Sequence, residues 1–186
     1  MPIGKQIMEG MLWHYKMPKD AAYKKAVQLL EEVGITDAEK RMKSYPHQLS
    51  GGMRQRVVIA IAVACNPQIL ICDEPTTALD VTIQAQILQL IRDLQKELGM
   101  SVIYITHDLG VVAELCDRVV VLYGGLVMEE AEINDLFENP LHPYTKGLLS
   151  CIPIADPKLA RAHASAGVEG DLPSPVNPKP GCRFCG

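Results

Sequence analysis

The sequence predicts an α/β domain built around a parallel sheet. Three short apolar runs, at residues 68–72, 101–106 and 118–122, alternate with stretches of helical periodicity. The order strand, helix, strand, helix, strand favours parallel strands joined by crossover helices. The unbroken run QILIC at 68–72 is typical of a strand buried on both faces of such a sheet. Ligands of these sheets gather at the carboxyl ends of the strands.

Length and composition exclude several classes of protein. The chain has 186 residues, of which 48% are hydrophobic and 22% are charged, as in an ordinary globular domain. Eighteen Lys and Arg residues against 22 Asp and Glu give a net charge of -4 without a basic block, which does not support a nucleic-acid partner. No apolar run approaches the ~20 residues that span a bilayer. Scattered cysteines in apolar or helical stretches indicate reduced, buried thiols; they are Cys65, Cys72, Cys116 and Cys151.

Two helices are predicted before the first strand. Residues 19–33 place their apolar side chains on one face, and Gly34 follows as a stop signal. Ser50 precedes two glycines and a stretch rich in Val, Ile and Ala at residues 53–65. Because Ser is a favoured N-cap and Pro67 cannot continue a helix, this stretch predicts a second helix that begins after Ser50.

The elements after the first strand follow the same logic. Asp80 is a favoured cap for the helical pattern at 81–98. A short helix is predicted between the strands at 101–106 and 118–122, and a Tyr-Gly-Gly turn followed by residues 126–129 predicts a hairpin return strand. From residue 156 onward the chain is rich in Pro, Ala, Gly and Ser without an apolar period, which predicts a loosely ordered tail.

Two adjacent carboxylates, Asp73 and Glu74, end the first strand. Successive strand residues point to opposite faces, so the two side chains can address different parts of one ligand. One can hold a hydrated Mg²⁺ while the other orients an attacking water, which is what hydrolysis of a nucleotide γ-phosphate needs. Taken alone, the dipeptide favours the alternative of a solvated strand end with an Asp-Glu-Pro turn, because such dipeptides are common.

Two further signals point to a phosphate. Ser50, Gly51 and Gly52 stand at a helix start, where free N–H groups and the helix dipole favour an anion and the glycines permit close approach. An ordinary Ser cap is the alternative. His107 follows the strand at 101–106 and is positioned to sense a phosphate, with a structural histidine as the alternative.

Together these signals form four motifs that resemble those of ABC-type ATPases. They are the signature loop LSGGMRQR at 49–56, the Walker B sequence ILICDEP at 69–75, the D-loop Ala78-Leu79-Asp80, and the switch-histidine sequence Thr106-His107-Asp108. Further strings resemble the ATP-binding subunits of bacterial dipeptide, oligopeptide and nickel importers. They are YPHQ at 45–48, DVTIQAQ at 80–86, NPLHPYT at 139–145, and the tail segments LPSP at 172–175 and GCRF at 181–184.

The resemblance implies a composite ATP site at a subunit interface. The residues that would contact the nucleotide of the opposite subunit are Ser50, Gly51, Gly52 and Gln55. Asp73 would hold Mg²⁺ through water, and Glu74 would act as the base on the attacking water. His107 would contact the γ-phosphate, and Asp80 would link the two sites across the dimer.

The resemblance also implies an assembly. An ATP-hydrolysing subunit of this kind uses ATP and Mg²⁺ and couples hydrolysis to uptake. Its partners would be a second ABC ATPase subunit, identical or homologous, two membrane permease subunits and an extracytoplasmic substrate-binding protein, at the cytoplasmic face of the inner membrane. Whether the substrate is a dipeptide, an oligopeptide or a nickel chelate stays open, because selectivity lies in the partners.

The sequence departs from the family in lacking G-x-x-x-x-G-K-[ST], the loop that holds the phosphates. We therefore expect a fragment of a longer protein that is inactive in isolation, because positioning supplies most of the catalysis in phosphoryl transfer. In the family's strand order the strand before that loop lies between those at 101–106 and 118–122. Without it, the strand at 101–106 would expose a long apolar edge, and the strand at 118–122 would lose its nearest neighbour.

The expected fold is thus part of a P-loop ABC ATPase domain. Residues 1–66 would form the helical subdomain with the signature loop, and 67–155 would form the Walker B half of the α/β core with C-terminal helices. Residues 156–186 would form the tail. Its single Cys-x-x-Cys, Cys182 and Cys185, resembles part of an iron–sulfur motif of some members, but one pair cannot fill four ligand positions. We therefore expect no metal in this tail, and whether a full-length tail binds a cluster stays open.

Two other functions remain to be weighed. One is a non-catalytic interaction module that supplies only its signature face to a partner ATPase. The other is an ABC-type ATPase of DNA repair, which the acidic balance of the chain and the His-Pro-Tyr sequence at 142–144 disfavour.

Overall fold

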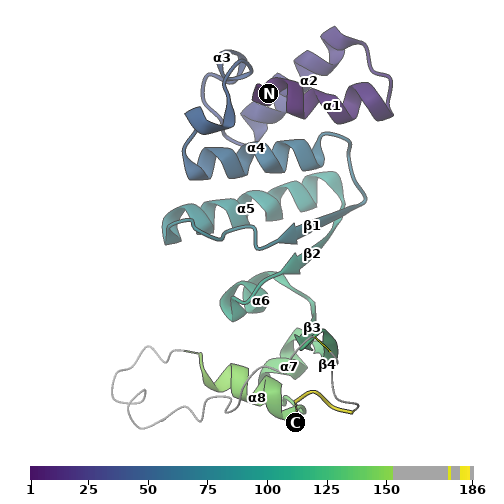
Figure 1. The fold of residues 1–186 in the computed structure, drawn as a ribbon, viewed down its shortest axis with the longest axis vertical. Helices are drawn as coiled ribbons and strands as arrows, with labels where there is room; N and C mark the ends of the chain where they lie inside the picture. The colour runs from purple at the N-terminus through teal and green to yellow at the C-terminus, as the bar shows by residue number, and fades with distance from the viewer. Residues whose placement is uncertain (153–175, 177–180, 185–186) are drawn as a thin grey trace. The chain divides into compact units, whose positions relative to one another are not determined.

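The computed structural model describes residues 1–152, 176 and 181–184. The chain divides into two compact units, residues 1–105 and 106–186, and each has its own two-stranded sheet (Figure 1). The functional segments 1–66, 67–155 and 156–186 stay a prediction. The predicted loose order of the tail falls on residues that, apart from Val176 and 181–184, lie outside the described part of the chain.

Helices dominate the first unit. They are α1 (Ile3–His14), α2 (Lys19–Glu32), α3 (Ala38–Arg41), the short 3₁₀ helix η1 (Pro46–Gln48), α4 (Gly51–Val63) and α5 (Val81–Leu98). Both α1 and α2 contact α4, and α4 in turn contacts α5 (Figure 1). The predicted helices are confirmed, and α4 begins directly after Ser50, at Gly51. Helix α1 was not predicted, although Ile3, Ile7 and Met11 recur every four residues and are buried.

Strand β1 (Ile69–Asp73) pairs in parallel with β2 (Ser101–Ile105), as predicted. The prediction that β1 is buried on both faces is wrong. Leu70 and Cys72 lie in the core, whereas Ile69 and Ile71 are 58% and 64% exposed. The burial of β2 alternates in the same sense. The physical reason is that α4 and α5 supply the apolar cover on one face only, and no other element of residues 1–105 covers the second face.

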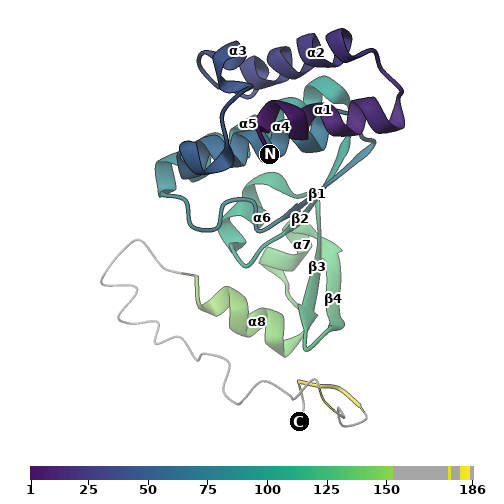
Figure 2. The same cartoon turned by 45° about the horizontal axis from the view of Figure 1, so that its top comes forward.

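The second unit consists of short elements. They are α6 (Leu109–Leu115), β3 (Arg118–Tyr123), β4 (Leu126–Glu132), α7 (Ile133–Glu138) and α8 (Pro143–Ser150). Strands β3 and β4 form the predicted hairpin, which extends to Glu132 (Figure 2). Its turn needs glycine, because Gly124 and Gly125 have φ angles of +55° and +79°. The strand neighbour of β3 in this sheet is β4.

Within the part of the chain that the structure describes, no helix combines the length and apolar character needed to span a bilayer. The predicted order of helices and strands is otherwise retained, and the fold is a mixed α/β one with small sheets.

Candidate functional site

The signature loop is held by a helix cap. The Ser50 hydroxyl accepts a hydrogen bond from the Met53 N–H at 3.3 Å, so Ser50 is the N-cap of α4 as predicted. Gly52 lies against α5: a Cβ atom at this position would stand 2.8 Å from Cγ2 of Ile83. The first turn of α4 therefore packs closely on the first turn of α5, and only glycine permits this approach.

The candidate D-loop lies beside the signature loop. Asp80 caps α5 by accepting a hydrogen bond from the Ile83 N–H at 3.0 Å. A Cβ atom at Gly51 would be 3.5 Å from Cδ2 of Leu79, which is ordinary contact distance. The structure therefore brings together two of the predicted motifs, and it gives Asp80 a local task as the cap of α5.

Glu74 sits directly beyond the end of β1 in a constrained turn. Its backbone N–H donates to the Ile105 carbonyl at 2.9 Å, and its φ angle is +48°, which is uncommon for a residue with a side chain. The Thr77 hydroxyl donates to Glu74 Oε2 at 2.9 Å. The half-buried carboxylate is thus oriented by its own turn, while the neighbouring Asp73 is exposed as the last residue of β1.

The carboxylates suit a magnesium ion that is held partly by other groups. Among the described residues, no three His, Cys, Asp or Glu side chains form a ready-made metal site. Mg²⁺ commonly binds through one or two carboxylates together with waters and substrate phosphates, and one exposed carboxylate such as Asp73 meets that requirement.

The cysteines differ in burial, and the prediction that the four scattered thiols are buried holds in part. Cys72 is buried beneath the candidate site, and this burial raises the pKa of its thiol to about 11, so it is protonated and unreactive at neutral pH. Cys65 and Cys116 are half-buried. The prediction is wrong for Cys151, which is exposed because it follows the last turn of α8.

His107 belongs to the second unit and is exposed. The turn around it is ordered by its neighbour: Asp108 donates its N–H to the Thr106 hydroxyl at 3.0 Å and caps α6 through Oδ1. The role of His107 stays a prediction, as does that of Gln55, which is half-buried on α4.

Arg56 is a residue whose role was not predicted. Its guanidinium group donates from Nη1 to the Val33 carbonyl at 2.6 Å and from Nη2 to Gln86 Oε1 at 3.1 Å. Gly34 leaves room for it, because a Cβ atom there would lie 3.0 Å from Nη1. Arg56 therefore ties the signature helix to the end of α2 and to α5. The sequence signal that could have pointed to Arg56 is its place in the signature string, one helical turn after Gly52.

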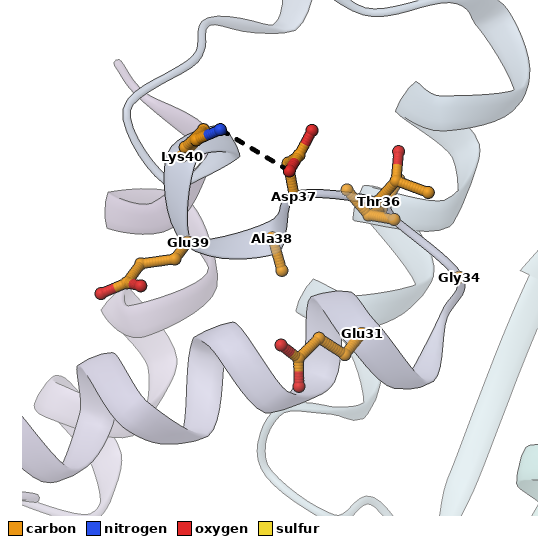
Figure 3. A pocket seen from close by; sticks show the side chains of 8 residues that line it. Glu31, Gly34, Thr36, Asp37, Ala38, Glu39 and Lys40 are labelled. Carbon is orange, nitrogen blue, oxygen red and sulfur yellow. Dashed lines mark ion pairs between the residues drawn. The ribbon is translucent and has the colours of Figure 1, made fainter.

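Two hollows in the first unit lie away from these residues. One, of about 510 Å³, lies between the end of α2 and the start of α3 (Figure 3). Glu31, Asp37 and Glu39 line it, and Lys40 approaches Asp37 at 3.8 Å. The other, of about 680 Å³, is lined by residues of α1 and by Lys19. Neither hollow contains a predicted site residue.

Two family models match the chain. One, described as ABC transporter, matches residues 5–77, which include the signature loop and Walker B candidates. The other, described as Oligopeptide/dipeptide transporter, C-terminal region, matches residues 128–186.

Curated relatives match along almost the entire chain. An oligopeptide transport ATP-binding protein of Bacillus subtilis, AppD, is 55% identical over 99% of this chain and 55% of its own length. A dipeptide transport ATP-binding protein of the same organism, DppD, is 52% identical over 99% of this chain and 54% of its own length. The chain thus spans about half the length of the curated relatives it matches.

Solved structures of ABC transporter cassettes are similar to this chain as well. The dimeric structure of a bacterial ABC transporter cassette is 32% identical, with a TM-score of 0.62, over 72% of this chain and 57% of that one. A post-hydrolysis dimer of the same cassette, bound to ADP and phosphate, matches equally well, with a TM-score of 0.62 over 72% of this chain and 58% of that one. The chain therefore belongs to the family of ATP-binding proteins of oligopeptide and dipeptide ABC transporters.

Proposed function

We propose that this chain carries the signature-loop and Walker B parts of an ATP-hydrolysing site in a peptide importer. The observation that carries the proposal is the geometry of Glu74. It stands at the carboxyl end of a parallel strand, where ligands of such sheets bind, and its carboxylate is oriented by Thr77 next to Asp73.

Each carboxylate has a distinct task in this proposal. Glu74 accepts the proton of the attacking water, and the Thr77 hydroxyl fixes the direction in which the carboxylate faces. Asp73 holds Mg²⁺ through water, and the ion, when bound, neutralises charge on the phosphates. His107 contacts the γ-phosphate.

The signature side acts on a nucleotide held by another subunit. The proposed contacts are Ser50, Gly51, Gly52 and Gln55. The exposed Ser50 and the N-terminus of the thirteen-residue helix α4 favour a phosphate there. Asp80 caps α5 between Leu79 and Ile83, which lie against Gly51 and Gly52. This position beside the signature loop supports its proposed role in linking two sites across a dimer.

The whole protein, in this proposal, works in an assembly at the cytoplasmic face of the inner membrane. It pairs with a second ABC ATPase subunit, as the related cassette does in its dimeric structure. Two membrane permeases and an extracytoplasmic substrate-binding protein complete the importer. The substrate is a peptide, because the relatives are named for oligopeptide and dipeptide transport.

The second candidate is a non-catalytic module that supplies only the signature face to a partner ATPase. The absence of G-x-x-x-x-G-K-[ST] from the sequence favours it for the chain by itself. In that case the chain alone neither binds ATP tightly nor hydrolyses it. Turnover by the isolated chain that Glu74→Gln abolishes would contradict this candidate.

The main test supplies the phosphate-binding loop. Residues 1–186 are joined to the N-terminal part of the Bacillus subtilis oligopeptide transport ATP-binding protein, and phosphate release is measured. Glu74→Gln keeps size and hydrogen bonding but removes the base, so hydrolysis should fall by roughly 10²–10⁴-fold while ATP binding persists.

The matched control is Glu97→Gln, which makes the same chemical change on the exposed surface of α5. It should leave turnover unchanged. Equal turnover of the Glu74→Gln and control proteins would refute the role of Glu74.

A further inference from the structure

The NPLHPYT sequence at 139–145 has no part in the proposed ATP site, and the structure gives it a defined shape. The carboxylate of Glu129, on β4, accepts hydrogen bonds from the N–H groups of Leu141 and His142 at 2.7 and 3.0 Å. The Tyr144 N–H donates to Nδ1 of His142 at 3.1 Å, which makes the histidine ring the N-cap of α8. The histidine ring is therefore held by a backbone hydrogen bond, and the backbone before it is fixed by Glu129.

The rings of this segment meet the end of β3. The centroids of Tyr123 and Tyr144 are 4.6 Å apart. Next to Tyr123, the Gly124–Gly125 turn presents the Gly124 carbonyl, and a Cβ atom at Gly125 would be 3.7 Å from the nearest tail atom. The hairpin end thus combines a cluster of three rings, Tyr123, His142 and Tyr144, with one backbone acceptor.

Two tail residues occupy this place. The Phe184 ring lies 5.5 Å from the rings of Tyr123 and His142 and 5.6 Å from that of Tyr144. These separations fall within the range of attractive edge-to-face and tilted aromatic pairs. The Arg183 guanidinium group donates to the Gly124 carbonyl. Both tail side chains are half-buried.

We propose that the three-ring cluster and the Gly124 carbonyl form a binding site for an arginine–phenylalanine pair, occupied by this chain's own Arg183 and Phe184. The site joins two sequence features outside the ATP site, NPLHPYT and GCRF, as a receptor and its ligand. Because both lie on one chain, docking is intramolecular, so a few weak contacts suffice to fill the site.

The first test uses trypsin on the 186-residue chain under reducing conditions. Trypsin cleaves after Arg183 only when that segment leaves its site, so the release of residues 184–186, followed by mass spectrometry, reports undocking. One aromatic pair is worth about a 2- to 12-fold change in an equilibrium. Tyr144→Ala removes one of the three ring contacts to Phe184, so cleavage should accelerate by about 2- to 12-fold. Tyr144→Phe keeps the ring and should behave as the wild type.

A control separates undocking from unfolding. Tyr45→Ala removes an exposed ring of the first unit and should leave the rate unchanged. The cleavage rate of Tyr144→Ala reports undocking only if hydrogen exchange of β3 and β4 stays as slow in this variant as in the wild type. If Tyr144→Ala unfolds the hairpin, the Phe184→Ala variant is used instead, and hydrogen exchange of residues 181–184 is measured. Faster exchange in this variant than in the wild type supports docking. Equal rates in the wild type and in the informative variant overturn the proposal.

The second test supplies the ligand separately. A labelled peptide of residues 176–186 is added to the chain carrying Arg183→Ala and Phe184→Ala, and fluorescence anisotropy is recorded. It should bind this variant at least about tenfold more tightly than the wild type, whose site is filled. The same peptide with Phe184→Ala should bind neither. Equal binding of the peptide to both chains overturns the proposal. If protection from trypsin increases with protein concentration, the site is filled by the tail of a second copy, and the intramolecular form of the proposal is overturned.

Discussion

Different kinds of contact stabilise the interior of each of the two units. In residues 1–105, buried side chains from α1 to α5 and from β1 form one continuous hydrophobic cluster, and Val102 and Tyr104 of β2, which are half-buried, pack against it. In the described part of residues 106–186, the buried residues are Val111, Val112, Val121, Leu136 and Thr145. There, polar anchors such as Glu129 and a cluster of rings fix the loops. The difference teaches that the candidate carboxylates rest on a packed support, whereas the C-terminal segment depends on a few directed contacts.

The largest expected effect compares two leucines with the same burial. Leu30, on α2, and Leu136, on α7, are 0% and 1% exposed. Leu30→Ala should destabilise the first unit by about 3–5 kcal/mol, because the surrounding cluster cannot collapse around the cavity. Leu136→Ala should cost the second unit about 2–3 kcal/mol, since fewer buried neighbours lose contacts.

Urea titration followed by hydrogen exchange of peptides from each unit measures both effects in the intact chain. Equal losses in the two units would contradict the view that their cores differ. A loss that spreads to both units in either variant would show that the two unfold together.

Arg56 tests how the signature helix is attached to the first unit. Arg56→Ala removes the bonds to the Val33 carbonyl and to Gln86, and hydrogen bonds to charged groups are worth about 1.5–3 kcal/mol. Arg56→Lys should recover only part of this, because an ammonium group lacks the guanidinium fork. Gln86→Ala loses one bond on the exposed side and should cost less than either. Urea-induced unfolding is the measurement, and a neutral Arg56→Ala would contradict the tie.

The smallest effect concerns the polar anchor of the second unit. Desolvation acts to raise the pKa of Glu129, but hydrogen bonds from the N–H groups of Leu141 and His142 outweigh it, so that the folded-state pKa is lowered. The ionised carboxylate therefore stabilises the fold.

The sign of the pH effect follows. Because the folded pKa lies below the unfolded value of about 4.3, the contribution is complete above that pH and is lost as the pH falls through the folded value. The stability difference between wild type and Glu129→Gln should be constant near neutrality and shrink below about pH 4. Glu130→Gln, which removes an exposed ion pair with Arg118, is the control and should cost under about 1 kcal/mol. A difference that grows in acid would contradict the anchor.

Local sequence signals predicted most of the elements and the positions of the site residues. Ser50 and Asp80 are helix caps as expected, and Gly99 ends α5 with a φ angle of +63°. Such features depend on backbone groups within a few residues, so the sequence reveals them directly. Glu74 and Asp73 are placed at the end of β1 for the same reason.

Tertiary structure decided what depends on distant neighbours. QILIC reads as a fully buried strand, yet Ile69 and Ile71 are exposed, because burial depends on which elements cover each face. The turn that orients Glu74 through Thr77 needs the Ile105 carbonyl of another strand. The role of Arg56 depends on Val33 and Gln86, 23 and 30 residues away. Phe184 and Tyr123 meet although no local pattern links them. The sequence by itself determined the motifs, the caps and the family resemblance, whereas contacts across long separations, set by packing, were visible only in the folded chain.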